Sequence, residues 1–529
     1  MRQFCFTRAR FENSCHFHSG PHYIIKIMAG IVRQFGKNVF TSWTSLAVRI
    51  ILVFLVNPFI IHTLGDDRYG VWVLVVSIIN YMTILDLGLK QALIRFISKF
   101  LGLGDFDRIN SILNTAFVIY MAVGLVVVAV TILLSFTALG WFSIPEHLLS
   151  QARLALIIVG ATAALNFILL CWGDSLGAFH RYDVSYGLMI FEDILRTTAI
   201  VILLKNGGGL VPFALVFLAF GLLRLISGAI ALKKLFPKIK LKFGGTDKEA
   251  FKLLWGYGLY SFLVSVAWLL ISNTDNVLIG YFLDTSAVTK YAIAAGFIVY
   301  LRSAVLAVSF PLRPVISHYD ALDKIENIRF IYTQGTKYIY FVTFLIGGGT
   351  IFFADSLIHL WMGPGYEQTA LILKILVIPA AVFLPQLVAS SVLFGTEKHR
   401  YLLYIIIIEG IINLVLSVIL VRYYGLLGIA YGTVIPQVLV YLIIVPRVIR
   451  TVLGFNLWRY YRFIFTSAAP AFAFAAALSY TLKTILPPDN WGIFIGETAA
   501  VAILSILSAR WIFDREELKS VLERFFARP

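Results

Sequence analysis

The sequence of 529 residues carries little charge, and this scarcity excludes most classes of soluble protein. Asp, Glu, Lys and Arg make up 14% of the chain, against about 25% in soluble globular proteins. Hydrophobic residues make up 60%, and the mean hydropathy is +0.87. The composition therefore excludes an ordinary cytosolic or secreted enzyme.

Motifs that carry chemistry are also scarce. The three cysteines, Cys5, Cys15 and Cys171, form no Cys-x-x-Cys pair, so the sequence predicts neither a disulfide framework nor a zinc site. No Walker loop, nucleophile elbow, kinase signature or zinc-binding histidine pair occurs. We therefore expect no enzyme activity, no catalytic residue, no metal site and no cofactor.

Long apolar runs are what the sequence has in abundance. A helix that crosses a bilayer needs about 20 mainly apolar residues. The runs do not alternate as the strands of a membrane barrel would, so they predict an all-α polytopic membrane protein with about fourteen transmembrane helices. These spans are expected at 41–64, 69–88, 111–136, 151–174, 187–204, 209–232, 254–283, 287–310, 338–361, 369–393, 402–421, 425–445, 465–485 and 491–511.

The basic residues predict how these spans are oriented. An even number of spans places both termini on one side, and the loops of that side hold 33 of the 44 Lys and Arg residues. Basic loops favour the cytoplasmic face, so we expect both termini to be cytoplasmic. The net charge of +16 is then explained by topology, and nucleic acid is not an expected partner.

The loops divide the chain into six parts. The parts are a cytoplasmic N-terminal tail (1–40), a first lobe of spans one to six (41–232), a basic cytoplasmic linker (233–253), a second lobe of spans seven to twelve (254–445), two further spans (465–511) and a cytoplasmic tail (512–529). Within the first part, residues 1–27 are either a disordered tail or an upstream extension before Met28.

A weak internal repeat relates the two lobes. The tripeptide His-Arg-Tyr begins at His180 and recurs at His399, and each copy is followed by an apolar span that contains a glutamate. The same offset places Asn57 of the first span opposite Asn276 of the seventh. A shift of six spans preserves orientation, so we expect two parallel six-helix repeats, as in transporters that rock about a central site.

Two stretches resemble a known family. The segments are 58–70 (PFIIHTLGDDRYG) with 86–95 (DLGLKQALIR), and 273–283 (NTDNVLIGYFL) with 288–292 (VTKYA). Together they resemble the bacterial polysaccharide exporters known as Wzx-type O-antigen flippases. The resemblance implies the V-shaped, two-lobed fold of multidrug (MATE) transporters and lipid II flippases. The two last spans are similar to the extra pair of the lipid II flippases.

The resemblance also implies a function. It implies transport of a polyprenyl-pyrophosphate-linked glycan across the bacterial inner membrane by alternating access, for polysaccharide biosynthesis. The partners implied are this glycan, membrane lipids, and a polysaccharide polymerase or chain-length machinery. A cation-coupled multidrug exporter of the MATE type is the alternative, and it would favour an acidic or aromatic cavity with few arginines.

Charges inside the spans are the candidate functional residues, because a charge at the centre of a membrane helix costs about 2.5–3.5 kcal/mol. Arginine suits a phosphate group, since its planar fork donates two hydrogen bonds. The substrate-binding candidates are Arg49, Arg224, Arg302, Asn57 and Asn276.

Acidic residues in the same spans have other expected roles. Glu192 and Arg196 are four residues apart on one helix and are expected to form a structural ion pair. Similar depths in the membrane also predict a pair between Arg49 and Asp86. Candidates for binding a coupling ion, with H⁺, Na⁺ or none left open, are Asp275, Asp86 and Glu409.

One cytoplasmic segment is predicted to lie flat on the membrane. Residues 89–103 alternate basic and apolar side chains in the pattern of an amphipathic helix. With the basic linker, this helix would attract anionic lipid headgroups.

Overall fold

A computed structural model describes residues 21–179, 181–240 and 246–512, and within these ranges the protein is helical and contains no strand. Every expected span lies on a helix or on the short helical turn that continues one. Ten helices of the described part are long and apolar enough to cross a membrane by themselves. The all-α fold of a multi-pass membrane protein is thereby confirmed, whereas the number fourteen stays a prediction. Residues 1–20 of the N-terminal tail lie outside the described residues.

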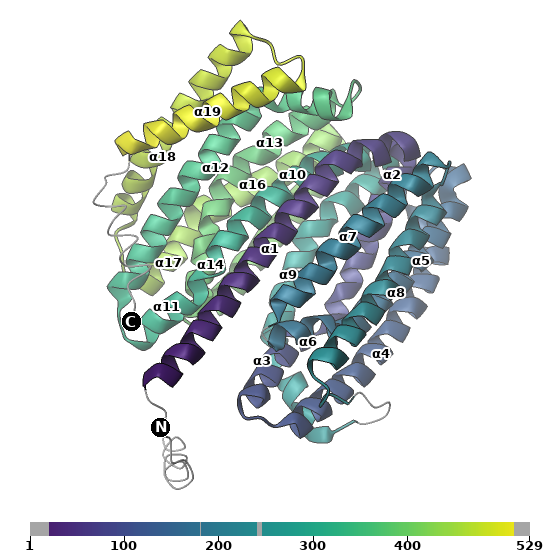
Figure 1. The fold of residues 1–529 in the computed structure, drawn as a ribbon. Helices are drawn as coiled ribbons and strands as arrows, with labels where there is room; N and C mark the ends of the chain where they lie inside the picture. Colours follow the sequence, from purple (N-terminus) through teal and green to yellow (C-terminus); the bar gives the residue numbers. More distant parts are fainter. Residues whose placement is uncertain (1–20, 180, 241–245, 513–529) are drawn as a thin grey trace.

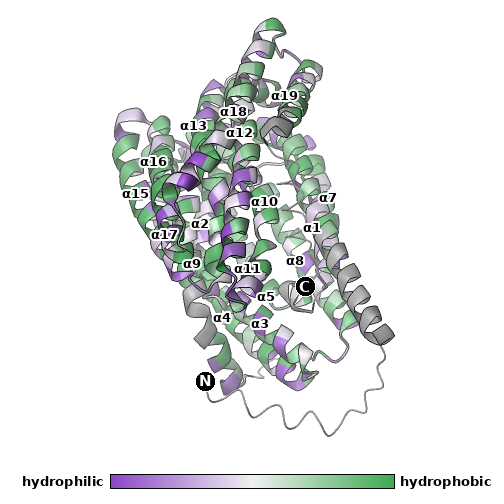
Figure 2. Ribbon diagram, turned by 90° about the vertical axis from the view of Figure 1, so that its left-hand side faces the viewer, coloured by the Kyte–Doolittle hydropathy of each residue, from purple (hydrophilic) through white to green (hydrophobic). Residues whose placement is uncertain are grey.

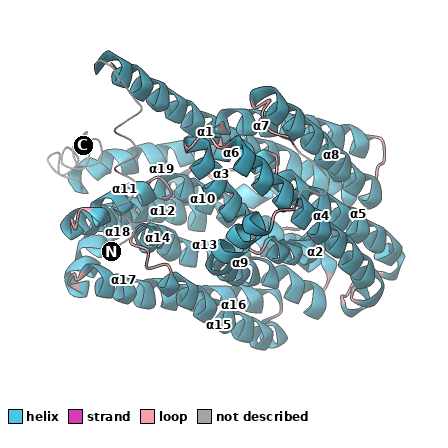
Figure 3. Cartoon of the chain, turned by 90° about the horizontal axis from the view of Figure 1, so that it is seen from below, coloured by secondary structure: helices cyan, strands magenta, loops and turns pink. Residues whose placement is uncertain are grey.

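The helices gather into two groups, which are seen apart from below (Figure 3). Helices of the first lobe pack around two apolar clusters, one towards each end of the helices. Their bounds are α1 (Pro21–Leu64), α2 (Asp66–Tyr81), α4 (Phe106–Thr137), α5 (Glu146–Leu170), α7 (Tyr182–Lys205) and α8 (Leu210–Leu235). In Figure 1, α1 runs diagonally between this group and the second one.

Two large clusters of buried apolar residues hold the helices of the second lobe together. The bounds are α9 (Lys248–Phe282), α10 (Thr285–Ser309), α12 (Ile325–Met362), α13 (Glu367–Phe383) with α14 (Leu387–Gly395), α15 (Arg400–Tyr424), and α16 (Leu426–Leu439), which continues through a π-helical turn (Val440–Ile444) into α17 (Val445–Leu453).

Short helices lie on the side where α1 begins (Figure 1). They are α3 (Leu89–Gly102), α6 (Gly173–Ala178) and α11 (Leu312–Ala321). The helix expected over 89–103 is confirmed as α3, whose apolar face, including Leu93, is buried while Arg95 is exposed. Along most helices the residues are hydrophobic (Figure 2), as expected of surfaces that face lipid.

Two C-terminal helices, α18 (Leu457–Ile485) and α19 (Trp491–Ile512), follow the second lobe, and α18 packs along α12. A buried polar network joins α12 to α18: the hydroxyl of Tyr332 donates to Oε1 of Gln386 at 3.0 Å and lies 2.9 Å from the hydroxyl of Tyr460. Nε2 of Gln386 donates to the same Tyr460 hydroxyl at 3.0 Å. Buried polar groups need such partners, so the network fixes how α18 docks on the second lobe.

Candidate functional site

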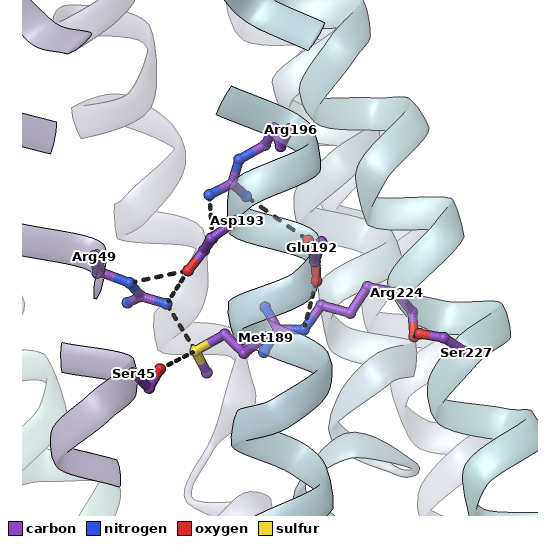
Figure 4. A network of polar contacts seen from close by, with 8 residues as sticks. All are labelled: Ser45, Arg49, Met189, Glu192, Asp193, Arg196, Arg224 and Ser227. Carbon is purple, nitrogen blue, oxygen red and sulfur yellow. Dashed lines mark hydrogen bonds and ion pairs between the residues drawn. The ribbon is translucent and has the colours of Figure 1, made fainter. Parts of the chain in front are cut away.

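A cluster of charged residues joins α1, α7 and α8 inside the first lobe (Figure 4). Asp193 of α7 lies at its centre: its Oδ2 accepts from Nε and Nη2 of Arg49 at 3.4 and 3.3 Å. Its Oδ1 accepts from Nη2 of Arg196, one helical turn further along α7, at 2.5 Å. The same Asp193 carboxylate therefore bridges two arginines from different helices.

The neighbouring carboxylate, Glu192, extends the cluster in the opposite direction. Its Oε1 lies 3.7 Å from Nη1 of Arg196, and its Oε2 lies 3.6 Å from Nε of Arg224 on α8. The predicted pair between Glu192 and Arg196 is therefore present. Three arginines face two carboxylates, so the cluster keeps an excess of one positive charge.

Burial differs sharply between the two signs of charge. The side chains of Glu192 and Asp193 are each 8% exposed, whereas Arg49 is 46% and Arg224 37% exposed. A buried carboxylate is tolerated when a cation and further hydrogen bonds compensate it. The arginines thus hold the carboxylates with part of the guanidinium, and the rest of each side chain remains exposed.

The charge of Arg49 also acts on a residue of the second lobe. Figure 4 shows Arg49 on one side of α7 and Arg224 on the other. Its guanidinium acts electrostatically on Tyr300 of α10, a helix of the second lobe. Arg49 therefore pairs with Asp193 in its own lobe, and its charge acts over a longer distance on the second lobe.

The predicted pair between Arg49 and Asp86 is wrong. Asp86 instead accepts hydrogen bonds from the hydroxyl of Tyr120 at 2.7 Å and from the backbone nitrogen of Lys90 at 3.3 Å. These bonds anchor the turn that precedes α3. Equal depth in the membrane does not fix the direction in which a side chain points around its helix. Arg49 pairs with Asp193 because these two side chains point toward each other, whereas Asp86 points elsewhere.

A polar seam joins the two lobes where α2 meets α9. Nδ2 of Asn80 donates to Oδ1 of Asn273 at 3.1 Å, and Nδ2 of Asn276 donates to the hydroxyl of Ser77 at 3.1 Å. The predicted substrate-binding residue Asn276 is therefore at a lobe interface. Its repeat partner Asn57 is half-buried on α1.

Asp275 points away from this seam into the second lobe. Its Oδ2 accepts from the hydroxyl of Tyr291 at 2.6 Å and from that of Thr433 at 2.9 Å, and Asn413 donates to the Thr433 hydroxyl at 3.1 Å. Within the described part of the chain, its buried Oδ1 has no hydrogen-bond partner. A buried carboxylate oxygen without a donor is costly, which marks the position as one where a cation or a proton would be stabilising.

The remaining candidates lie together in the second lobe. The guanidinium of Arg302 lies 3.6 Å from the ring centre of Trp268, and Glu409 acts on it electrostatically. Glu409 in turn accepts a 2.8 Å hydrogen bond from the hydroxyl of Tyr441, in the π-helical turn that follows α16. Arg302 is thus placed inside this lobe, against an indole face, where a cation–π contact offsets its desolvation.

Near the end of α1, hydrogen bonds join the two lobes. Pro58 has no backbone N–H, so the carbonyl of Phe54 one turn earlier lacks its helical partner. The indole nitrogen of Trp361 on α12 donates to this carbonyl at 2.6 Å. Nε2 of His62 also lies 2.8 Å from the carbonyl oxygen of Met362.

The start of α2 contributes the rest of these contacts. The hydroxyl of Tyr366 donates to Oδ1 of Asp66 at 2.5 Å, and that of Thr285 to Oδ1 of Asp67 at 2.8 Å. Gly70 lies so close to α10 that a Cβ atom there would be 1.8 Å from the Thr285 carbonyl oxygen. Helices α2 and α10 therefore touch backbone to backbone. We call the contacts of Phe54, Asp66, Asp67 and Gly70 with the second lobe the outer closure.

Comparison with known proteins places this arrangement in a family context. Residues 35–319 match the model of a family described as "Polysaccharide biosynthesis protein", and residues 261–419 match the MatE model. The chain is 22% identical to the uncharacterized membrane protein EpsK of Bacillus subtilis over 93% of this chain and 98% of that protein. It is also 22% identical to the probable flippase AglR of Haloferax volcanii, over 77% of this chain and 80% of that protein.

A solved structure shows the same fold. The lipid II flippase MurJ, in an inward closed conformation, superimposes with a TM-score of 0.70 at 16% identity, over 93% of this chain and 99% of that one. The match extends over most of the chain, so the likeness is to the whole arrangement of helices rather than to one lobe.

Proposed function

Because the chain belongs to the polysaccharide biosynthesis protein family and has the fold of membrane flippases and MATE transporters, we propose that it moves a lipid-linked oligosaccharide across the bacterial inner membrane. The substrate class is a polyprenyl-pyrophosphate-linked glycan destined for a polysaccharide. The glycan passes between the lobes while the polyprenyl tail stays in lipid, because sugar hydroxyls are costly to bury in hydrocarbon.

One observation supports this substrate above others: the half-exposed guanidinium of Arg49, in a cluster with excess positive charge, near a helix of the second lobe. The planar, permanently charged guanidinium can bind phosphate oxygens with two parallel hydrogen bonds. Asp193 and Met189 hold the guanidinium in place, so little conformational entropy is lost when the anion binds.

The outer closure fits one half of an alternating-access cycle. It joins the lobes near the ends of α1 and α12. In the opposite state these contacts would break and the lobes would part at that end. Each bond contributes about 0.5–1.5 kcal/mol, so a few of them make a barrier that substrate or ion binding can overcome.

We assign the coupling role to Asp275. Its oxygen without a partner, together with the nearby Thr433 and Asn413 side chains, offers oxygen atoms that suit Na⁺ or a proton. Glu409 remains a second candidate because it is buried beside Arg302. Asp86 is a weaker candidate, since it anchors the turn before α3.

The same proposal covers location and partners. Both termini lie in the cytoplasm of a bacterium, in accord with the basic loops. The glycan would be delivered to a polysaccharide polymerase or chain-length machinery on the far side.

A reconstitution experiment tests the substrate assignment. The purified chain is placed in vesicles containing a polyprenyl pyrophosphate that carries one N-acetylglucosamine, and glycan exposure at the far leaflet is read with an impermeant lectin. We expect Arg49→Ala to slow exposure at least tenfold and Arg49→Lys to restore little, because a lysine cannot form the bidentate contact. Arg422→Ala is the matched control, since Arg422 lies over Phe282, away from the cluster. Full activity of Arg49→Ala at normal protein level would refute the assignment.

The MatE match of residues 261–419 and the buried Asp275 keep the multidrug exporter as a second candidate. Ethidium efflux driven by a Na⁺ or H⁺ gradient distinguishes the two. Efflux that requires Asp275 and ignores Arg49, without any glycan movement, would replace the flippase proposal.

A further inference from the structure

An apolar groove lies at the junction of the two lobes, on the side where α3 lies and away from the charged cluster. Its volume is about 440 Å³. One wall is α4 of the first lobe, another is the start of α9 of the second, and the turn before α3 forms a third side. The residues that line it are Leu85, Leu87, Thr115, Val118, Ile119, Ala122, Val123, Val126, Thr246, Phe251 and Trp255.

The wall from α9 combines two aromatic rings with two lysines. Lys248, Phe251, Lys252 and Trp255 are spaced at i, i+3, i+4 and i+7, so they form one stripe on the helix. The rings of Phe251 and Trp255 stack at 5.9 Å between centres and are 48% and 56% exposed. An exposed aromatic pair next to lysines is the pattern of a membrane–water interface.

The orientation of the groove is fixed by hydrogen bonds at its polar end. The hydroxyl of Thr115 accepts from the backbone nitrogen of Asp247 at 3.0 Å, and the hydroxyl of Ser111 donates to Oδ2 of the same aspartate at 2.6 Å. These bonds hold the beginning of α9, with Lys248, at the level of Thr115. The hydroxyl of Ser111 and the backbone nitrogen of Glu249 lower the pKa of Asp247, so this carboxylate is charged but already occupied by donors.

The length of the groove matches one leaflet. Along α4 the lining runs from Thr115 to Val126, about 16 Å at 1.5 Å per residue. Half of a hydrocarbon core of about 30 Å is about 15 Å. A chain that starts at the lysines and follows the groove therefore ends near the middle of the bilayer.

From this geometry we propose that the groove is a binding site for an anionic phospholipid of the leaflet next to the linker. One acyl chain lies between α4 and α9, against Phe251 and Trp255, and the phosphate contacts Lys248 and Lys252. The charge of the lysines selects an anionic headgroup, and the apolar lining selects a hydrocarbon chain. Because the walls come from different lobes, this lipid lies between the two lobes and contacts both. The proposal does not depend on what the protein transports.

Tryptophan quenching tests the site in the intact chain. The purified protein is reconstituted in phosphatidylcholine vesicles that contain a minor fraction of phosphatidylglycerol or phosphatidylcholine with brominated acyl chains. The quenching that is lost in Trp255→Phe reports the groove. Each lysine attracts an anionic headgroup by about 1 kcal/mol. We therefore expect brominated phosphatidylglycerol to quench more strongly than brominated phosphatidylcholine, by a factor of about five for each of the two lysines.

Three variants sharpen the result. The double variant Lys248→Gln/Lys252→Gln should bring the two lipids to equal quenching, whereas Lys233→Gln/Lys234→Gln, at the end of α8, should preserve the preference. Ala122→Phe should reduce quenching by both lipids, because it fills the groove. Equal quenching by both lipids in the unaltered chain, or an unchanged signal in Trp255→Phe, would overturn the proposal. Displacement of the brominated phosphatidylglycerol by an equimolar polyprenyl phosphate would also overturn it and assign the groove to the glycan carrier.

Discussion

Gly70→Ala is the substitution that tests the outer closure most directly. The added Cβ would lie 1.8 Å from the carbonyl oxygen of Thr285, and ordinary contact begins at 3.4 Å. Helices α2 and α10 must therefore separate by about 1.6 Å, the difference between these distances. Both colliding groups belong to helix backbones, so no side-chain rotation can relieve the contact.

The separation has a predictable energetic cost. The bonds from the hydroxyl of Thr285 to Asp67 and from that of Thr289 to the Asp66 carbonyl, now 2.8 and 2.7 Å, would exceed hydrogen-bonding distance. Two lost bonds cost about 1–3 kcal/mol. The higher helix propensity of alanine does not enter this balance, because α2 is helical in both states. A loss of about 1–3 kcal/mol shifts the balance between closed and open states by roughly 5- to 150-fold.

Distances between spin labels measure that shift. Labels at Gly140 of the first lobe and Tyr424 of the second, in a chain without its native cysteines, report the separation at this end. We expect a longer-distance population in Gly70→Ala. The control is Gly296→Ala, because nothing lies within 4 Å of a Cβ at that position of α10. A distance distribution in Gly70→Ala identical to that of the unaltered chain would show that the contact does not hold the closed state.

Three further predictions concern single contacts. Trp361→Phe keeps the ring stacked on Phe54 but removes the bond to its carbonyl, so thermal unfolding should show a loss of about 1 kcal/mol; no loss would mean that water replaces the indole. Asp193→Asn leaves two partly exposed arginines without their shared carboxylate, and we expect a loss of about 1–2 kcal/mol after allowance for solvent screening; unchanged stability in chemical denaturation would contradict a bridging role. Burial raises the pKa of Asp183, but hydrogen bonds from Arg181 and Lys37 outweigh it and lower the pKa from 3.8 to about 2, so this stabilisation is complete above pH 3.8 and is lost as the pH falls through about 2. Melting temperatures between these pH values should fall less steeply in Asp183→Asn, and an identical slope would refute the linkage.

Much of the membrane architecture could be predicted from the sequence because it depends on local properties. Apolar runs of sufficient length form helices in lipid whatever their neighbours are. The amphipathic pattern of residues 89–103 appeared as α3 for the same reason. The pair of Glu192 and Arg196 was predictable too, since four residues on one helix set the distance between them.

Pairs of residues on different helices could not be predicted from the sequence. Arg49 and Asp86 share a depth, yet the structure pairs Arg49 with Asp193, because rotation about the helix axis and the order of helices in the bundle decide which side chains meet. Only one feature of the outer closure could be recognised in the sequence: Pro58, which leaves the carbonyl of Phe54 without its helical partner. The neighbouring sequence does not indicate that Trp361, some 300 residues later, donates to this carbonyl.

The sequence by itself determined that this chain is a bundle of membrane helices with a basic side and with arginines and carboxylates at costly positions. Only the tertiary structure decided that Asp193 bridges two arginines, that Asp275 turns from the α2 seam into the second lobe, and that Gly70 brings two helix backbones into contact. The physical reason is the range of each effect: hydrophobic transfer and helix formation act over one turn or one span, whereas ion pairs and close packing depend on the relative rotation of helices that are distant in the chain.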